Sequence, residues 1–133
     1  MAKKRILVVD DEAIVTRTLK LYLEATGSYE VQTENQGSRA VVTARAFKPD
    51  LVMLDLIMPD TDGATVAGDL KADAALKNTP IIFLTALVSK KEVGDKGKNI
   101  GGHPFLAKPV DPEKVIEAIE RLTAKAGPKQ GGG

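Results

Sequence analysis

The sequence predicts an α/β fold in which helices cover both faces of a doubly wound, five-stranded parallel sheet. Five short strand-like segments alternate along the chain with five segments of helical character. Three of the strands are apolar throughout, which is typical of strands buried on both faces. Acidic residues follow two of these apolar strands directly, where open α/β sheets bind their ligands.

The first half of the chain supplies two strands and two helices. The apolar run Ile6 to Val9 predicts the first strand, and apolar residues at helical spacing predict a helix from Ala13 to Thr26. Gly27 is suited to end that helix. Residues 29–34 alternate like a half-exposed strand, and a second amphipathic helix follows over 40–47. The first helix is expected to face the core with Val15, Leu19, Tyr22 and Leu23.

The third and fourth strands are the most apolar segments. The apolar run Leu51 to Leu54 is followed by a single acid, Asp55. This pattern predicts a buried strand that places a carboxylate where the strands of the sheet end. Read alone, Asp55 could equally open a turn. Ile81 to Leu84 forms the fourth strand and ends at Thr85. The helix between these strands is marked by Val66, Ala67, Leu70 and Ala74.

The last third of the chain begins with its weakest helical signal. Four glycines between residues 87 and 102 would each cost about 1 kcal/mol inside a helix, so a short or mobile helix is expected there. Residues 104–107 predict a short fifth strand, and Asp111-Pro112 predicts the start of the last helix. We expect one domain over residues 1–126 and a disordered tail over 127–133.

The character of the strands also predicts their order. The three apolar strands belong inside the sheet, whereas the alternating second strand and the short fifth suit its edges. With right-handed crossovers the most economical order is 2-1-3-4-5, that of a flavodoxin-like (βα)5 three-layer sandwich. Its ligand site lies between strands one and three, which end in Asp10-Asp11 and Asp55.

Composition excludes several classes of function. The 133 residues, 43% hydrophobic, suffice for one domain, and the lack of cysteine excludes disulfides, thiolate catalysis and cysteine metal sites. The chain has nineteen basic and eighteen acidic residues and no tryptophan, so it lacks the excess of positive charge that direct nucleic-acid binding requires. Neither a signal peptide nor a membrane span is recognisable, so a cytoplasmic protein without membrane contact is expected.

Three carboxylates, those of Asp10, Asp11 and Asp55, are expected to converge at one edge of the sheet. Like charges at such a site persist only if protons or a cation offset them. Mg²⁺ fits, because it binds one or two carboxylates and accepts phosphate oxygens as further ligands. Calcium would require more protein oxygens, and zinc lacks nitrogen and sulfur ligands. Read alone, Asp10-Asp11-Glu12 would favour helix capping, but the convergence with Asp55 favours the metal.

Lys108 and Thr85 follow the fifth and fourth strands and are expected at the same edge. Each read alone has an ordinary explanation, a solvated lysine and a threonine that ends a strand. Together with the acids they could form an aspartyl phosphate. The carboxylate of Asp55 would be the nucleophile, the cation and the ammonium would neutralise phosphoryl oxygens, and the hydroxyl would bond to one of them.

Four motifs in matching order resemble the receiver domains of two-component response regulators. They are VVDDE at 8–12, LDLIMPDTDG at 54–63, LTA at 84–86 and FLAKP at 105–109. The resemblance covers Arg5 to about Lys125. It implies that Asp55 is the phosphoacceptor and that Asp11 binds Mg²⁺ directly. Asp10 would act largely through water, and the backbone carbonyl of Ile57 would be a further ligand.

The resemblance also implies how the phosphoryl group is received and read. The donor would be a sensor histidine kinase or a histidine phosphotransfer protein. Lys108 would pair with the phosphate, and its bond to Pro109 would be cis. Thr85 and Phe105 match the switch pair, in which the hydroxyl moves to the phosphate and the ring turns inward. The downstream target is not identifiable, and a homodimer formed on phosphorylation is one output that the resemblance allows.

This chain departs from the family pattern at a few positions. Phe105 lacks the hydroxyl of the tyrosine often found there. Ile57 and Leu87 are apolar and offer nothing to position a hydrolytic water, so a long-lived phosphoryl group is expected. His103, the only histidine, is expected to be a surface loop residue rather than a phosphocarrier, since Gly101-Gly102 and Pro104 flank it.

Two other functions compete with a phosphoacceptor. One is a receiver-like binding module that works without phosphorylation, which the intact set of site residues disfavours. The other is a Mg²⁺-dependent phosphatase of the haloacid-dehalogenase type, which needs a second acid two residues after the nucleophile. That position holds Ile57. Because no output domain follows the last helix, either a free-standing regulator or a piece of a larger protein is expected.

Overall fold

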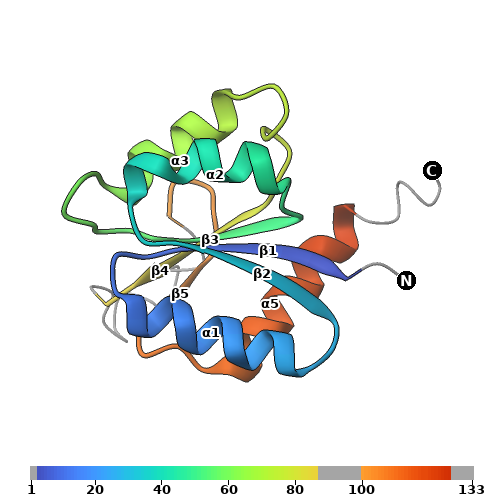
Figure 1. Ribbon diagram of the computed structural model, residues 1–133. Coiled ribbons are helices and arrows are strands. Elements are labelled where there is room, and N and C mark those ends of the chain that lie inside the picture. Colours follow the sequence, from blue (N-terminus) through green and yellow to red (C-terminus); the bar gives the residue numbers. More distant parts are fainter. Residues whose placement is uncertain (1–2, 87–99, 127–133) are drawn as a thin grey trace.

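A computed structural model describes residues 3–86 and 100–126 and contains one parallel sheet (Figure 1). The strands run in the order β2-β1-β3-β4-β5, so the predicted order is confirmed. All four neighbouring pairs are parallel. The strands are β1 (Lys4–Val9), β2 (Tyr29–Glu34), β3 (Leu51–Asp55), β4 (Ile81–Thr85) and β5 (Phe105–Ala107).

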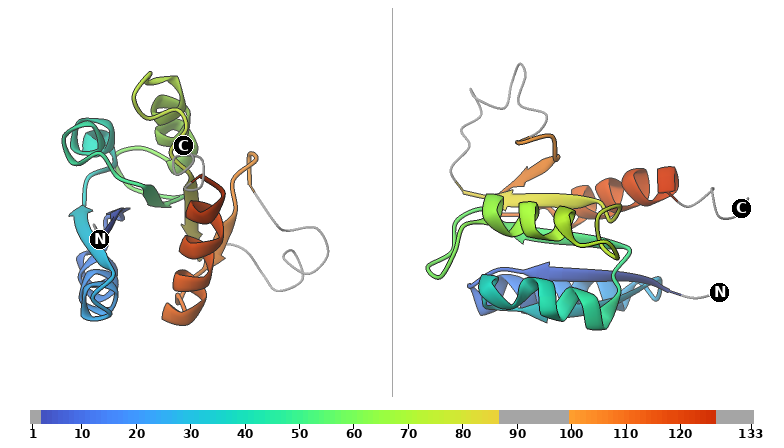
Figure 2. Two further views of the ribbon diagram at one scale, coloured as in Figure 1. Left: turned by 90° about the vertical axis from the view of Figure 1, so that its right-hand side faces the viewer. Right: turned by 90° about the horizontal axis from the view of Figure 1, so that it is seen from above.

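The described helices cover both faces of the sheet and form the outer two of three layers (Figures 1 and 2). Helices α1 and α5 lie on one face, and α2 and α3 lie on the other. The predicted fourth helix and the predicted tail fall largely or wholly on residues 87–99 and 127–133, outside the described residues. The bounds are α1 (Ala13–Ala25), the 3-10 turn η1 (Gly37–Arg39), α2 (Ala40–Phe47), α3 (Gly63–Ala72) and α5 (Pro112–Ala126).

The alternation of side chains along each strand divides the core in two. In β1, Ile6 and Val8 pack toward α1 and α5, whereas Leu7 and Val9 pack toward α2 and α3. All four are fully buried. Burial of each such side chain stabilises the fold by about 1.5–3 kcal/mol, which explains why β3 and β4 contain no polar residue before their last position.

Two of the predicted core positions are wrong. Tyr22 is 37% exposed, and Thr16 takes a buried place on α1, because Asn35 Nδ2 donates to its hydroxyl at 3.0 Å. Ala74 lies beyond the end of α3, since the chain becomes extended at Asp73, and Leu76 is buried instead. The other expected core residues of α1 and α3 are buried or half-buried.

A polar network joins the beginning of β1 to α5 at the amino ends of the strands, on the side of the sheet opposite the acids. Lys4 Nζ donates to Glu120 Oε1 at 2.8 Å and to Thr123 Oγ1 at 2.9 Å. The hydroxyl of the buried Tyr29 donates to Glu120 Oε2 at 2.5 Å. Hydrogen bonds from Lys4 and Tyr29 hold the pKa of Glu120 below its ordinary value. Helix α5 is therefore attached to both β1 and β2 at this end of the sheet.

None of the helices in the described ranges is both long and apolar enough to cross a membrane.

Candidate functional site

Strand register brings the predicted acids together. Val9 of β1 lies opposite Leu54 of β3, so the residues that follow them, Asp10 and Asp55, leave the sheet side by side. One carboxylate oxygen from each of Asp10, Asp11 and Asp55 lies within 4.8 Å of the others. Asp10 and Asp55 are buried, and Asp11 is exposed. The predicted convergence of three carboxylates is confirmed.

The donor set suits a hard divalent cation. All of its ligand atoms are carboxylate oxygens, and among the described residues the buried Asp10 Oδ2 is paired only with the Lys108 ammonium. The capping alternative is not supported, because Glu12 is the residue that precedes α1 and its side chain caps no amide of the helix. Asp10 Oδ1 accepts the amide of Glu12 at 2.9 Å. These residues fit Mg²⁺, which prefers such oxygens and retains several waters.

The Lys108 side chain crosses from the end of β5 into this cluster of acids. Its Nζ lies 2.8 Å from Asp10 Oδ2, 2.9 Å from Glu12 Oε1 and 3.4 Å from Asp55 Oδ1. Burial lowers the pKa of Lys108, but hydrogen bonds to Asp10 and Glu12 raise it by more, so the ammonium form persists. The contact with Glu12 was not predicted, since an exposed acid after a strand has an ordinary role in solvent.

The Asp55 carboxyl has a perturbed titration. Burial raises its pKa to about 6, Asp10 and a hydrogen bond with Asp11 act in the same direction, and Lys108 opposes them. The side chain of Asp55 is 6% exposed, so water relieves little of this repulsion. Near neutral pH the carboxylate is therefore held at a free-energy disadvantage that a bound cation would remove.

We expect Asp55→Asn to raise the free energy of unfolding in EDTA near neutral pH by about 1–2 kcal/mol. The unfolded carboxyl titrates near 3.8 and the folded one near 6, so the folded state binds more protons between these values. The destabilisation is fully present above the folded pKa and is lost as pH falls toward the unfolded one. Urea unfolding at several pH values measures both effects, and equal pH slopes for the two proteins would contradict this assignment.

Thr85 lies at the same end of the sheet as the acids, and Phe105 begins β5. Thr85 is the buried last residue of β4, and its carbonyl accepts the amide of Lys108 at 2.8 Å. Phe105 lies opposite Phe83 in the register of β5 and β4, half-buried against the core under α2 and α3. The Lys108–Pro109 bond is cis. The side chain of Ile57 is exposed, and Leu87 is outside the described residues.

His103 lies in a turn, as predicted, but is not fully exposed. The amide of His103 donates to the carbonyl of Ile100 at 2.9 Å, and its ring meets Phe83 edge-on with centroids 5.6 Å apart. Burial lowers the pKa of His103, and Lys71 acts in the same direction. The contact with a core ring favours the packing role over that of a phosphocarrier.

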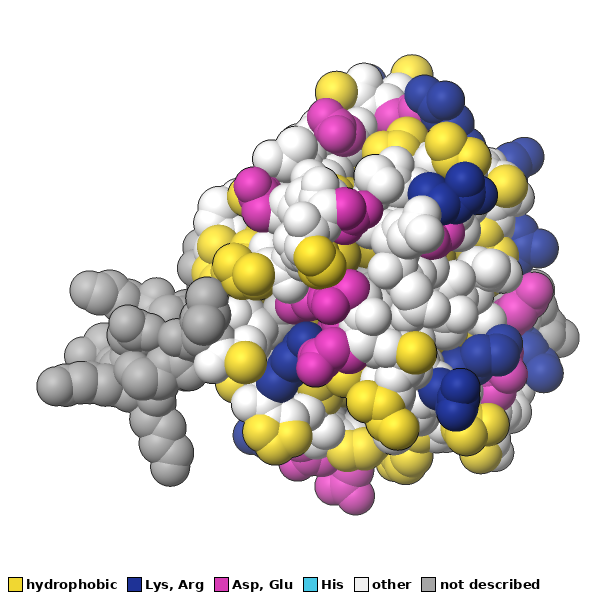
Figure 3. All heavy atoms as spheres, turned by 60° about the vertical axis from the view of Figure 1, so that its left-hand side comes forward, with side chains coloured by type: hydrophobic (Ala, Val, Ile, Leu, Met, Phe, Trp, Pro, Cys, Tyr) yellow, Lys and Arg dark blue, Asp and Glu magenta, His cyan; other side chains and the backbone are white. Residues whose placement is uncertain are grey.

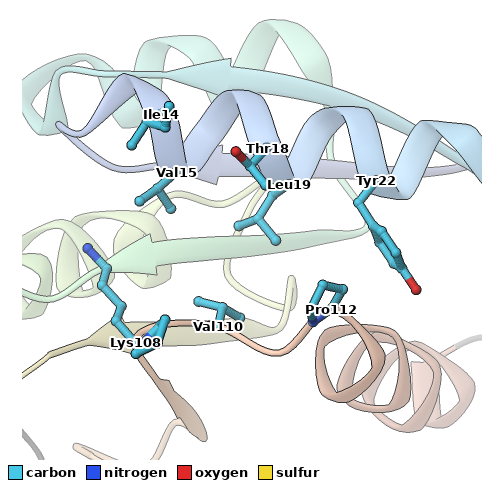
Figure 4. Close-up of a pocket in the computed structure, with 9 residues that line it drawn as sticks. Ile14, Val15, Thr18, Leu19, Tyr22, Lys108, Val110 and Pro112 are labelled. Atoms are coloured by element: carbon cyan, nitrogen blue, oxygen red, sulfur yellow. The ribbon is translucent and has the colours of Figure 1, made fainter.

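The surface around the cluster is apolar on one side. Figure 3 turns this edge of the molecule forward and shows acidic side chains beside a basic one, with hydrophobic side chains around them. A groove with mainly apolar walls runs beside Lys108, between α1 and the connection from β5 to α5 (Figure 4). Its walls include Ile14, Val15, Leu19, Tyr22, Val110 and Pro112.

Comparisons with known proteins agree with the geometry. Residues 6–120 match the family described as the response regulator receiver domain. The chain is 36% identical over 131 residues to the phosphate regulon transcriptional regulatory protein PhoB of Pseudomonas aeruginosa. This match covers 96% of this chain and 55% of PhoB. It is 38% identical over 130 residues to the alkaline phosphatase synthesis transcriptional regulatory protein PhoP of Bacillus subtilis, with 94% and 52% covered.

The chain thus spans about half the length of these curated relatives. Among solved structures, the chemotaxis response regulator CheY4 of Vibrio cholerae matches with a TM-score of 0.77 and 27% sequence identity. That match covers 91% of this chain and 99% of the other.

Proposed function

This chain belongs to the response regulator receiver domain family, and from that premise we propose that Asp55 accepts a phosphoryl group from a phosphohistidine in a Mg²⁺-dependent reaction. The observation that carries this proposal is the surroundings of the Asp55 carboxylate. It is buried at the end of β3, with oxygens of Asp10 and Asp11 within 4.8 Å and Lys108 Nζ at 3.4 Å.

The acids of this cluster supply the ligands. Asp11 would bind Mg²⁺ directly, Asp10 would act largely through water, and the backbone carbonyl of Ile57 would be a further ligand. The bound ion would neutralise the negative charge of the phosphoryl oxygens. Asp10 has a second task, since its buried carboxylate holds the Lys108 ammonium at 2.8 Å beside the phosphoacceptor.

Each remaining residue has one role in the transfer. A carboxylate oxygen of Asp55 forms a bond to phosphorus while the bond from phosphorus to the donor's imidazole nitrogen breaks. The electron pair of the broken bond stays on that nitrogen, and the imidazole takes up a proton from water. Lys108 pairs with the phosphoryl oxygens, and the Thr85 hydroxyl donates to one of them. Each chain carries one acyl phosphate, so the protein is a phosphoacceptor and not a turnover enzyme.

The partners follow from this chemistry. The donor is a sensor histidine kinase or a histidine phosphotransfer protein, and the reader is a downstream protein or an attached output domain. Thr85 and Phe105 would act as the switch, with the hydroxyl drawn to the phosphate and the ring turning inward. A homodimer formed on phosphorylation is one form of this output. PhoB and PhoP are named as transcriptional regulatory proteins, which favours an output in gene regulation.

The phosphoryl group is expected to be long-lived. Ile57, two residues after Asp55, presents an exposed aliphatic side chain and cannot orient a water for hydrolysis. Leu87 would contribute nothing more, although it lies outside the described residues. A phosphate-release assay on the purified phosphoprotein measures this, and rapid spontaneous loss would contradict the expectation.

The function is tested by incubating the protein with a small phosphodonor such as acetyl phosphate. Intact-mass spectrometry is expected to find one added phosphoryl group with Mg²⁺ and none in EDTA. Asp55→Ala should gain nothing under either condition, whereas Asp69→Ala, on the exposed side of α3, should behave like the wild type. No mass gain in the wild type would favour the binding module, and continuous release of phosphate would favour the phosphatase.

A further inference from the structure

The loop between β3 and α3, residues 56–62, connects the phosphoacceptor to the next helix and carries Ile57. Its base is held by backbone hydrogen bonds. The amide of Leu56 donates to the carbonyl of Leu84 at 2.9 Å, and the amide of Gly63 donates to the carbonyl of Leu56 at 2.7 Å. An antiparallel bridge pairs Ile57 with Asp62. The tip of the loop, Pro59 and Asp60, is exposed and lies beyond these contacts.

Asp60 attaches this tip to the beginning of η1. Its Oδ2 accepts the amide of Ser38 at 2.9 Å, and its Oδ1 accepts the amide of Gly37 at 3.3 Å. These amides lie at the start of η1, where backbone donors have no partner within the helix. We call Asp60 with these two amides the Asp60 latch. The same hydrogen bonds hold the pKa of Asp60 below its ordinary value, so the latch carries a full negative charge at neutral pH.

Close packing lies directly under the latch. A Cβ atom added to Gly37 would lie 2.6 Å from Thr61 Cγ2 and 2.9 Å from Met58 Cε. Met58 is buried in the core under α2 and α3. The two loops therefore fit against each other without room for one more carbon, and the latch fixes the distance between them.

We propose that Asp60 is a positioning residue, which holds the loop so that the backbone of Ile57 is set for the cation at Asp10, Asp11 and Asp55. This inference rests on the proposed function, because it takes the Ile57 carbonyl as a Mg²⁺ ligand. Asp60 does not belong to the acid cluster itself. Its effect passes through the loop, from the tip held on η1 to the ligand three residues earlier.

Isothermal titration of the phosphate-free protein with MgCl₂ tests the latch. Asp60→Ala is expected to weaken Mg²⁺ binding about tenfold, as the loss of residues that orient metal ligands does elsewhere. Asp60→Asn keeps one acceptor oxygen, which can serve the amide of Ser38 but leaves that of Gly37 without an acceptor, so it should weaken binding by less than Asp60→Ala does.

The control is Asp50→Ala, at the other end of β3. Asp50 Oδ2 accepts one backbone amide, that of Arg5, at 2.8 Å, so its loss removes one charge and one comparable hydrogen bond far from the acids. It should leave Mg²⁺ affinity unchanged while lowering the unfolding midpoint in EDTA. Amide hydrogen exchange at Gly37 and Ser38 should become faster in Asp60→Ala but not in Asp50→Ala.

Each outcome decides the matter. Unchanged Mg²⁺ affinity in Asp60→Ala, with faster exchange of the two amides, would show that the latch exists but does not position the loop. Equal weakening in Asp60→Asn and Asp60→Ala would show that the retained hydrogen bond to Ser38 does not hold the loop, and would overturn the proposal. Absence of Mg²⁺ binding by the wild type would count against the proposed function instead, and the two failures are thereby distinguished.

Discussion

Replacing Lys108 with methionine is expected to lower the free energy of unfolding in EDTA by about 3 kcal/mol and to slow phosphorylation of Asp55 at least about 100-fold. Asp10 is fully buried, and the ammonium of Lys108 at 2.8 Å is the only cation that the described residues place beside it. Its removal leaves a buried carboxylate uncompensated. It also removes the positive charge that would face the phosphoryl oxygens as the transfer proceeds.

The measurements are urea unfolding in EDTA and a time course of mass gain with acetyl phosphate. Saturating Mg²⁺ should restore more stability to Lys108→Met than to the wild type, because the ion supplies the missing charge. Lys114→Met, on the exposed side of α5, is the control and should change neither quantity by much. If Lys108→Met unfolded and reacted like the wild type, its ion pairs with Asp10 and Asp55 would have no part in the site.

Gly63→Ala is expected to destabilise the fold by about 2–3 kcal/mol and to weaken Mg²⁺ binding. Gly63 begins α3, and a Cβ atom there would overlap the carbonyl oxygen of Asp55 and lie 2.8 Å from Leu56 Cα. These are backbone atoms at the end of a buried strand and cannot move without moving Asp55. The substitution therefore acts on stability and on the metal ligands together.

A second glycine of the same helix is the matched control. A Cβ atom at Gly68 would have no atom within 4 Å, so Gly68→Ala should stabilise the protein by up to about 1 kcal/mol through helix propensity. The two substitutions are chemically identical, and their opposite signs would be measured by urea unfolding. Stabilisation by Gly63→Ala would contradict the close approach of α3 to the end of β3.

The parts of the fold that follow from chain order were predictable from the sequence. Apolar runs locate the central strands, and an acid directly after such a run must appear at the sheet edge, which is why Asp10 and Asp55 could be brought together in advance. The face of a helix is less certain, because a satisfied hydroxyl can enter the core. Thr16 is buried through its bond from Asn35, and Tyr22 is displaced to the rim of the groove beside Lys108.

Contacts that depend on side-chain reach between loops could not be predicted. Glu12 and Lys108 are 96 residues apart and meet at 2.9 Å only because β1 and β5 are parallel and end on the same side of the sheet. In the sequence, Asp60 is an ordinary turn residue. Its partners are backbone amides 22 and 23 residues earlier, and because every residue except proline has such an amide, the sequence does not indicate which ones it binds. The glycines at 37 and 63 are the signals that could have indicated close approach.

The network of Lys4, Tyr29 and Glu120 has a practical consequence for all of these experiments. It anchors the first strand and the last helix at the edge of the sheet farthest from the acids. A biotin or fluorophore coupled at Lys3 or near the end of α5 would leave the face around Asp55 open to a phosphodonor. Immobilised protein can therefore be used to capture partners that distinguish the phosphorylated from the unphosphorylated form.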